Sequence, residues 1–261
     1  MKTAVLFDLD GTLYEGDRLL PGAADAVRFL RDAGVPVRFL TNTTRISRRL
    51  LVAKLHGLGL EAEADEVFTA PVAAASLLAE RGVRRVMLLL PDAAHEEFSG
   101  FERADQEPES LVVGDLGEAW DFAVMNRAFR ALMSGAELVA LQKNRYWKDG
   151  DGLSLDAGPF VAALEYASGK EAELVGKPGA AFFGTAIRSA GVLPEHTVMV
   201  GDDIRGDVGG AQRTGAKGVL VRTGKFREDD AERSGVVPDL VINSVADIPE
   251  CFEQLLTRRS L

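Results

Sequence analysis

The sequence predicts an α/β fold: a Rossmann-like, parallel-sheet core domain with a second α/β domain inserted into it. Two observations support this prediction. In the first and last thirds of the chain, short apolar runs alternate with helical stretches, which is typical of parallel strands joined by right-handed crossovers. The middle has strands and a helix of its own. We therefore expect a discontinuous core over residues 1–77 and 174–261 and an inserted domain over 78–173.

Local patterns predict the individual elements. Residues 4–7 and 35–40 are apolar runs typical of buried strands, and residues 23–33 and 46–58 predict helices. The last third adds strands at 174–176, 197–200, 218–221 and 240–243, and helices after Pro178, at 208–213 and at 247–256. The inserted part adds strands at 86–90 and 138–141, a helix around 122–133 and an irregular stretch at 143–152.

The composition limits the classes of partner. A net charge of −10 argues against nucleic acid or an anionic membrane as the main partner, because both require a basic surface. Cys251 is the only cysteine, which fits a reduced cytoplasmic setting. No apolar stretch approaches the roughly 20 residues that span a bilayer, so we expect a soluble protein.

The first informative motif is Asp8-Leu9-Asp10-Gly11-Thr12. Asp8 and Asp10 stand two residues apart at the end of an apolar strand, where alternation sends both side chains to one side. The carboxyl ends of parallel strands are where such folds bind ligands, and Gly11 allows a sharp turn directly afterwards. The alternative is a strand that simply ends in a polar turn.

A second acidic group, Asp202 and Asp203, follows the predicted strand at 197–200. Two acidic clusters at neighbouring strand ends would repel each other unless a cation joined them. Carboxylate oxygens suit Mg²⁺, which keeps several waters and uses few protein ligands. For Asp203, capping of the following helix is a credible alternative.

Polar residues follow two further strands. Thr41 and Asn42 can donate hydrogen bonds to phosphate oxygens. For Thr43 and Thr44 we favour capping of a helix that begins at Arg45. Lys177 stands between a strand and a proline, in the same layer as the carboxylates. Most single lysines are solvated surface charges, but here an ammonium group would offset the carboxylates and bind phosphoryl oxygens.

Together these residues meet the needs of phosphoryl transfer, which depends on positioning and charge stabilisation. We expect a hydrolase of small-molecule phosphate esters. Two alternatives stay open: a catalytically idle protein that binds phosphate or a partner, and a phosphotransferase or mutase that passes the phosphoryl group to another acceptor.

The motifs, in this order, resemble those of the haloacid dehalogenase superfamily of phosphohydrolases. The insertion resembles the α/β cap (type IIA) of its NagD-like and nitrophenylphosphatase branch, and the segments 144–150 and 158–166 also resemble members of that branch. Caps in this branch often mediate dimers, so a homo-oligomer through the cap stays open.

The resemblance implies a role for each motif residue. Asp8 would attack phosphorus, and Asp10 would protonate the leaving group and then activate water. Thr41, Asn42 and Lys177 would bind the phosphate. Mg²⁺ would be held by the residues Asp8, Asp10 (through its main-chain carbonyl) and Asp202, with Asp203 or Asp207 in support.

A basic and aromatic patch lies within residues 143–148 of the insertion. Such loops often carry specificity, so the patch could face the active site and select the leaving group. Equally, it could be a hairpin whose aromatic side chains pack on the sheet, with residues 148–152 as its turn.

Overall fold

The structure is a computed structural model that describes residues 3–149 and 152–256. The chain divides into two compact units. The first consists of Met1–Thr41, Leu51–Phe68 and Lys177–Leu261, and the second of Asn42–Leu50 and Thr69–Gly176. The domain boundaries expected from the sequence differ from these bounds and stay a prediction.

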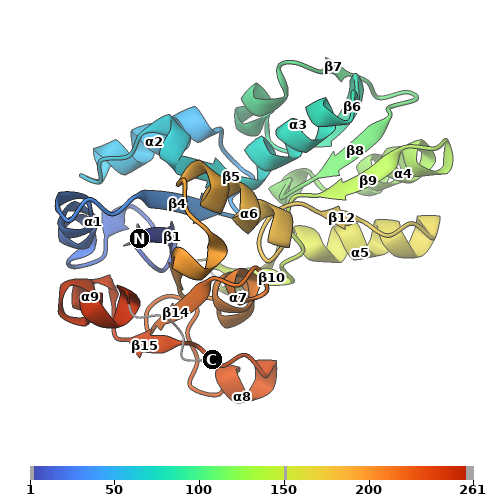
Figure 1. Ribbon diagram of the computed structural model, residues 1–261. Coiled ribbons are helices and arrows are strands. Elements are labelled where there is room, and N and C mark those ends of the chain that lie inside the picture. The colour runs from blue at the N-terminus through green and yellow to red at the C-terminus, as the bar shows by residue number, and fades with distance from the viewer. Residues whose placement is uncertain (1–2, 150–151, 257–261) are drawn as a thin grey trace. The chain divides into compact units, whose positions relative to one another are not determined.

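The first unit is built on a six-stranded sheet in the order β15-β14-β13-β1-β4-β5 (Figure 1). Its strands are β1 (Ala4–Asp8), β4 (Val37–Thr41), β5 (Val67–Thr69), β13 (Thr197–Gly201), β14 (Lys217–Val221) and β15 (Leu240–Ile242). β1 pairs in parallel with β13 on one side and β4 on the other, with Phe7 opposite both Val200 and Phe39. Every residue of β1 and β13 is buried, because helices cover both faces of a parallel sheet.

Helices flank this sheet on its two sides. The helices of this unit are α1 (Ala23–Asp32), α6 (Ala180–Ser189), α7 (Gly210–Gln212), α8 (Asp230–Ser234) and α9 (Ile248–Leu256), while α2 (Arg48–Gly57) crosses the division between the units. Figure 1 shows α1 and α9 together on one side of the sheet and α6 and α7 on the other. Phe29 of α1 meets Phe252 of α9 edge to face, with ring centroids 5.2 Å apart.

The second unit contains a five-stranded sheet in the order β12-β9-β8-β6-β7. Its strands are β6 (Arg85–Leu89), β7 (Glu102–Arg103), β8 (Ser110–Val113), β9 (Glu137–Ala140) and β12 (Glu173–Leu174), and its helices are α3 (Ala70–Glu80), α4 (Phe122–Met133) and α5 (Ala157–Ser168). Side chains alternate along β8: Leu111 and Val113 join the apolar cluster that includes residues of α4 and α5, and Val112 joins the cluster that includes residues of α3.

A separate hairpin pairs β10 (Tyr146–Asp149), which lies within the stretch expected to be irregular, with β11 (Gly152–Leu155), which begins at the last residue of that stretch. A small hairpin of β2 (Tyr14–Glu15) and β3 (Arg18–Leu19) follows β1. The predicted α/β fold class is confirmed. The helix predicted at 208–213 is present but begins earlier, as a π-helical turn, Ile204–Gly209, that is followed by the short α7. Within the described residues, no helix is long and apolar enough to cross a membrane.

Candidate active site

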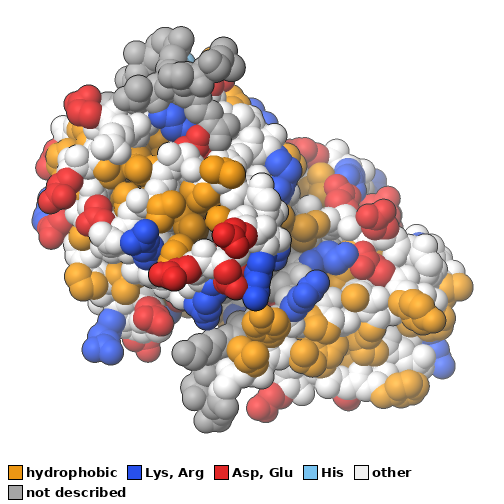
Figure 2. Space-filling model, turned by 90° about the horizontal axis from the view of Figure 1, so that it is seen from below, with side chains coloured by type: hydrophobic (Ala, Val, Ile, Leu, Met, Phe, Trp, Pro, Cys, Tyr) orange, Lys and Arg blue, Asp and Glu red, His pale blue; other side chains and the backbone are white. Residues whose placement is uncertain are grey.

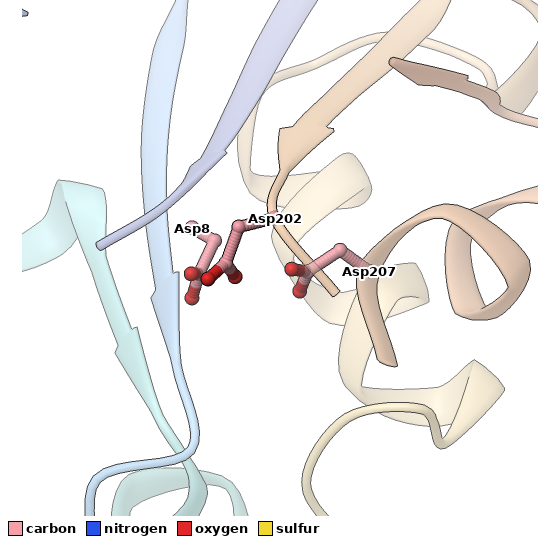
Figure 3. A group of neighbouring side chains, drawn as sticks. All are labelled: Asp8, Asp202 and Asp207. Carbon is pink, nitrogen blue, oxygen red and sulfur yellow. The ribbon is translucent and has the colours of Figure 1, made fainter. Parts of the chain in front are cut away.

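Three carboxylates meet at the carboxyl edge of the first unit's sheet. Asp8 is the last residue of β1, Asp202 directly follows β13, and Asp207 lies in the π-helical turn beyond it. One oxygen atom from each lies within 4.8 Å of the others, and all three residues are buried. Figure 3 shows the carboxylates of Asp8 and Asp202 side by side, with that of Asp207 directed toward them. The parallel pairing of β1 with β13 produces this arrangement, because it places their carboxyl ends at one edge.

Asp10 stands at the start of a tight turn. The main-chain N–H of Gly11 donates to the carbonyl of Tyr14 at 2.7 Å, and Gly11 has a φ of 85°, which glycine adopts without strain. Asp10 is exposed as a residue, but neighbouring protein atoms partly desolvate its carboxyl group. This desolvation, together with the charge of Asp8, raises the pKa of Asp10.

Lys177 supplies the positive charge of the site. Its ammonium group donates to Asp8 and, at 2.7 Å, to Asp207. Burial alone would lower the pKa of Lys177, but the charges of Asp207 and Asp8 outweigh that effect and raise it. The ammonium therefore stays charged and partly offsets the buried acids.

The two carboxylate oxygens of Asp202 differ in their hydrogen bonding. Its Oδ2 accepts the main-chain N–H of Lys225 at 2.7 Å, while its Oδ1 is buried without a hydrogen-bond partner among the described residues. Burial, followed by the charges of Asp8 and Asp207, raises the pKa of Asp202. A buried, unpartnered oxygen within a group of hard carboxylate donors fits a magnesium ion.

Asp203 and Asp207 play different structural roles. Asp203 Oδ1 accepts the main-chain N–H groups of Arg205 at 3.0 Å and Gly206 at 2.7 Å, so Asp203 caps the turn. Asp207 points back and accepts from the main-chain N–H of Asp203 at 3.1 Å. Asp207 thus belongs to the three-carboxylate group, and the metal role of Asp203 stays a prediction.

The remaining predicted ligands lie at the end of β4. Thr41 is its last residue and is buried, and the preceding Leu40 pairs with Asp8. Asn42 opens a segment assigned to the second unit, so its phosphate role stays a prediction.

The helix after this segment begins later than expected. α2 starts at Arg48, and Ser47 Oγ accepts the main-chain N–H of Leu50 at 3.3 Å. The prediction that Thr43 or Thr44 caps a helix from Arg45 is therefore wrong. Thr44 instead accepts the main-chain N–H of Asp115 at 2.9 Å.

The basic and aromatic patch ends in β10 of the β10–β11 hairpin, and its first residues precede that strand. Lys143 pairs with Glu165 at 2.8 Å, and Tyr146 is 58% exposed. The hairpin of the second alternative is therefore present, but the exposure of Tyr146 contradicts the part of that alternative in which this side chain packs on the sheet. Gly150 and Asp151 of the expected turn lie outside the described residues.

The sequence predictions missed a further strand end at this site. Residues 223–225 follow β14, and Thr223 donates to the carbonyl of Gly11 at 2.5 Å. The signal was present, because a threonine, a glycine and a lysine come soon after a predicted parallel strand. Thr12 was also missed as a contact: its hydroxyl lies 3.4 Å from Asp8 Oδ2.

The fold and site define a phosphohydrolase of the haloacid dehalogenase type. Residues 5–102 match the family described as haloacid dehalogenase-like hydrolase, and residues 174–248 match a HAD-hydrolase-like family. The chain is 47% identical to haloacid dehalogenase-like hydrolase domain-containing protein 2 from Homo sapiens, across 97% of this chain and 95% of that protein. The chain therefore belongs to the haloacid dehalogenase-like hydrolases, which confirms the resemblance found in its motifs.

Two solved phosphatases share this architecture. A p-nitrophenyl phosphatase from Archaeoglobus fulgidus superimposes with a TM-score of 0.90 at 30% identity, covering 96% of this chain and 99% of that one. A glycerol phosphate phosphatase from Mycobacterium tuberculosis, solved in complex with magnesium, gives a TM-score of 0.82 at 27% identity and covers 94% of this chain and 75% of that one.

Proposed function

We propose that this protein is a Mg²⁺-dependent phosphatase that hydrolyses small-molecule phosphate esters through an aspartyl-phosphate on Asp8. The observation that carries the proposal is the arrangement of Asp8, Lys177 and Asp202. It joins a nucleophilic carboxylate to a buried ammonium group and to a carboxylate oxygen that has no hydrogen-bond partner among the described residues. Phosphoryl transfer needs positioning and compensating charge, and these residues supply both.

Asp8 and Asp10 divide the chemistry between them. An oxygen of Asp8 attacks phosphorus, and the bond between phosphorus and the ester oxygen breaks. Asp10 gives its proton to the departing oxygen. Its raised pKa supports this role, because the acid form persists to a higher pH than for an ordinary aspartate. Asp10 then takes a proton from water as that water attacks the phosphoaspartate, which releases inorganic phosphate and restores Asp8.

Other residues bind the phosphoryl group and the metal. Lys177, Thr41 and Asn42 would bind phosphoryl oxygens. Asp8, Asp202 and the main-chain carbonyl of Asp10 would hold Mg²⁺, with Asp207 or Asp203 in support. When bound, Mg²⁺ neutralises charge on the transferring phosphoryl oxygens.

Hydrolysis of p-nitrophenyl phosphate tests the proposal. Purified protein is assayed with Mg²⁺ or with chelator, beside Asp8→Asn and a matched control, Asp32→Asn, on the exposed surface of α1. We expect Mg²⁺-dependent turnover that disappears in Asp8→Asn and persists in Asp32→Asn. Equal turnover by Asp8→Asn and wild type would contradict the assignment of the nucleophile. Binding of phosphate esters without turnover of any of them would favour the idle binding protein.

A homo-oligomer through the cap and a cytoplasmic location also belong to this proposal. In the second unit, Phe122 of α4 and Tyr166 of α5 are 83% and 93% exposed. Figure 2 shows apolar side chains gathered in patches between charged ones on the face it displays. Large exposed apolar patches are typical of protein interfaces, which supports association of two copies. Light scattering of wild type and Phe122→Glu would test it, since a monomeric wild type would contradict it.

A further inference from the structure

The loop after β14 contacts two separate parts of the active site. This segment, residues 223–225, is referred to below as the 223–225 loop. The hydroxyl of Thr223 donates to the main-chain carbonyl of Gly11 at 2.5 Å. The main-chain N–H of Lys225 donates to Asp202 Oδ2 at 2.7 Å. The loop therefore joins the turn after Asp10 to the carboxylate that follows β13, although that turn lies 212 residues before Thr223 in the sequence.

Between these two hydrogen bonds, two glycines meet at the same carboxylate. A Cβ atom on Gly224 would lie 2.7 Å from the Cα atom of Gly11 and would collide with Asp202 Oδ2. A Cβ atom on Gly11 would collide with the same oxygen and lie 3.0 Å from the Cα atom of Gly224. Both glycines have positive φ, 85° for Gly11 and 58° for Gly224. Only glycine permits this close approach at both positions.

The contacts determine which oxygen of Asp202 remains available. Oδ2 is occupied by the N–H of Lys225 and enclosed by the two glycines. Oδ1 is the buried oxygen without a described partner, in a residue whose carboxylate joins those of Asp8 and Asp207. Partners behind a metal ligand orient it and thereby set its affinity for the metal.

We propose that the 223–225 loop is a positioning element that fixes Asp202 and the Gly11 turn for Mg²⁺ binding, with Thr223 as its key side chain. This inference rests on the proposed function. The Gly11 carbonyl that Thr223 holds is adjacent in the chain to the Asp10 carbonyl expected to bind Mg²⁺. Thr223 thus acts on the main-chain part of the metal site, and the N–H of Lys225 acts on the carboxylate part.

The test measures Mg²⁺ binding directly, without turnover. Isothermal titration calorimetry on metal-stripped full-length protein compares wild type with Thr223→Val, which keeps the shape and removes the hydroxyl. A second variant, Thr223→Ser, retains the hydroxyl group. Thr185→Val is the matched control, because the Thr185 hydroxyl donates to the main-chain carbonyl of Ala181 and accepts from Arg188, both within α6 and on its exposed side. We expect Thr223→Val to weaken Mg²⁺ binding by about tenfold or more. Thr223→Ser and Thr185→Val should bind Mg²⁺ much as wild type does.

Several results would overturn the inference. It is wrong if folded Thr223→Val binds Mg²⁺ as tightly as wild type, or if Thr223→Ser binds as weakly as Thr223→Val. Should Thr223→Val fail to fold, Thr223→Ser and Gly224→Ala decide: an unchanged Mg²⁺ affinity in Gly224→Ala excludes a positioning role. Wild type that binds no Mg²⁺ would overturn both the loop's role and the metal assignment. Wild type that binds Mg²⁺ but turns over no phosphate ester would count against the proposed function alone.

Discussion

Lys177 and Asp207 form a buried ion pair, with 2.7 Å between Nζ and Oδ1, and the same ammonium group also contacts Asp8. Lys177 lies between β12 and α6, and Asp207 lies 30 residues later in the π-helical turn after β13. The physical consequence of the pair is that one cation compensates two buried carboxylates. Removing that cation takes away the ion pair of both carboxylates.

Lys177→Met should therefore be costly to both stability and turnover. Breaking a buried ion pair by removing one partner typically costs about 3–5 kcal/mol, because the remaining charge stays buried and unpaired. Urea denaturation measures the free energy of unfolding. Arg28→Met is the control, since Arg28 and Asp25 form an exposed pair that is worth about 0–1 kcal/mol at most. Equal losses in the two variants would contradict this account of the Lys177 pair.

Mg²⁺ affinity should rise with pH. Burial, then the charges of Asp8 and Asp207, raise the pKa of Asp202 in the metal-free protein, so its acid form persists toward neutral pH. A protonated carboxyl group does not ligate Mg²⁺, and metal binding must displace that proton. Calorimetry at pH values from acidic to alkaline should show tighter Mg²⁺ binding as the pH rises. At one pH, the binding enthalpy measured in buffers of different ionisation enthalpy should differ, because metal binding releases a proton that the buffer takes up. An affinity that stays constant with pH would argue against this competition.

Asp10→Asn should separate the two chemical steps. p-Nitrophenol leaves readily without a proton, so Asp8 should still become phosphorylated. Hydrolysis of the phosphoaspartate should slow by about 10²–10⁴-fold, because no base activates the water. Rapid mixing should then show a burst of p-nitrophenol of about one equivalent per enzyme molecule, followed by slow turnover. Asp8→Asn is the control and should give no burst. Steady turnover by Asp10→Asn at the wild-type rate would remove Asp10 from the mechanism.

Asp121 should matter for stability and not for chemistry. Its carboxylate accepts the main-chain N–H of Val124 at 2.7 Å and caps α4. Asp121→Ala should lower the free energy of unfolding by about 1 kcal/mol, and Asp121→Ser should restore most of it. Thermal and urea denaturation provide the measurement, with turnover of p-nitrophenyl phosphate expected to stay unchanged.

Much of the core and of the site could be predicted from local sequence. Buried runs such as Val5 to Phe7 and Val198 to Val200 are short, apolar and bounded by turns, so they identify strands of a parallel sheet. Because such strands end at one edge, the sequence also predicted that Asp8, Asp202 and Lys177 would meet. The structure brings these three residues together.

Other features depend on long-range contacts that local patterns do not reveal. The choice of Asp207 over Asp203 in the carboxylate group depends on a π-helical turn that directs Asp207 back toward Lys177. Assignment of residues 42–50 to the second unit reflects contacts such as the ion pair of Arg45 with Asp115 at 2.8 Å. The contact of Thr223 with Gly11 spans most of the chain and has no local signature beyond its position after a strand.

The central claim is that a phosphoryl group is carried on Asp8. Acid quenching during turnover of a phosphate ester, followed by peptide mapping by mass spectrometry, measures this directly. The account predicts a phosphorylated peptide that contains Asp8 in wild type with Mg²⁺, and its absence in Asp8→Asn or with chelator. Two results would contradict the claim. One is turnover by wild type with the phosphoryl group on a residue other than Asp8. The other is turnover by wild type with no phosphoryl group detected on Asp8, even in the Asp10→Asn variant.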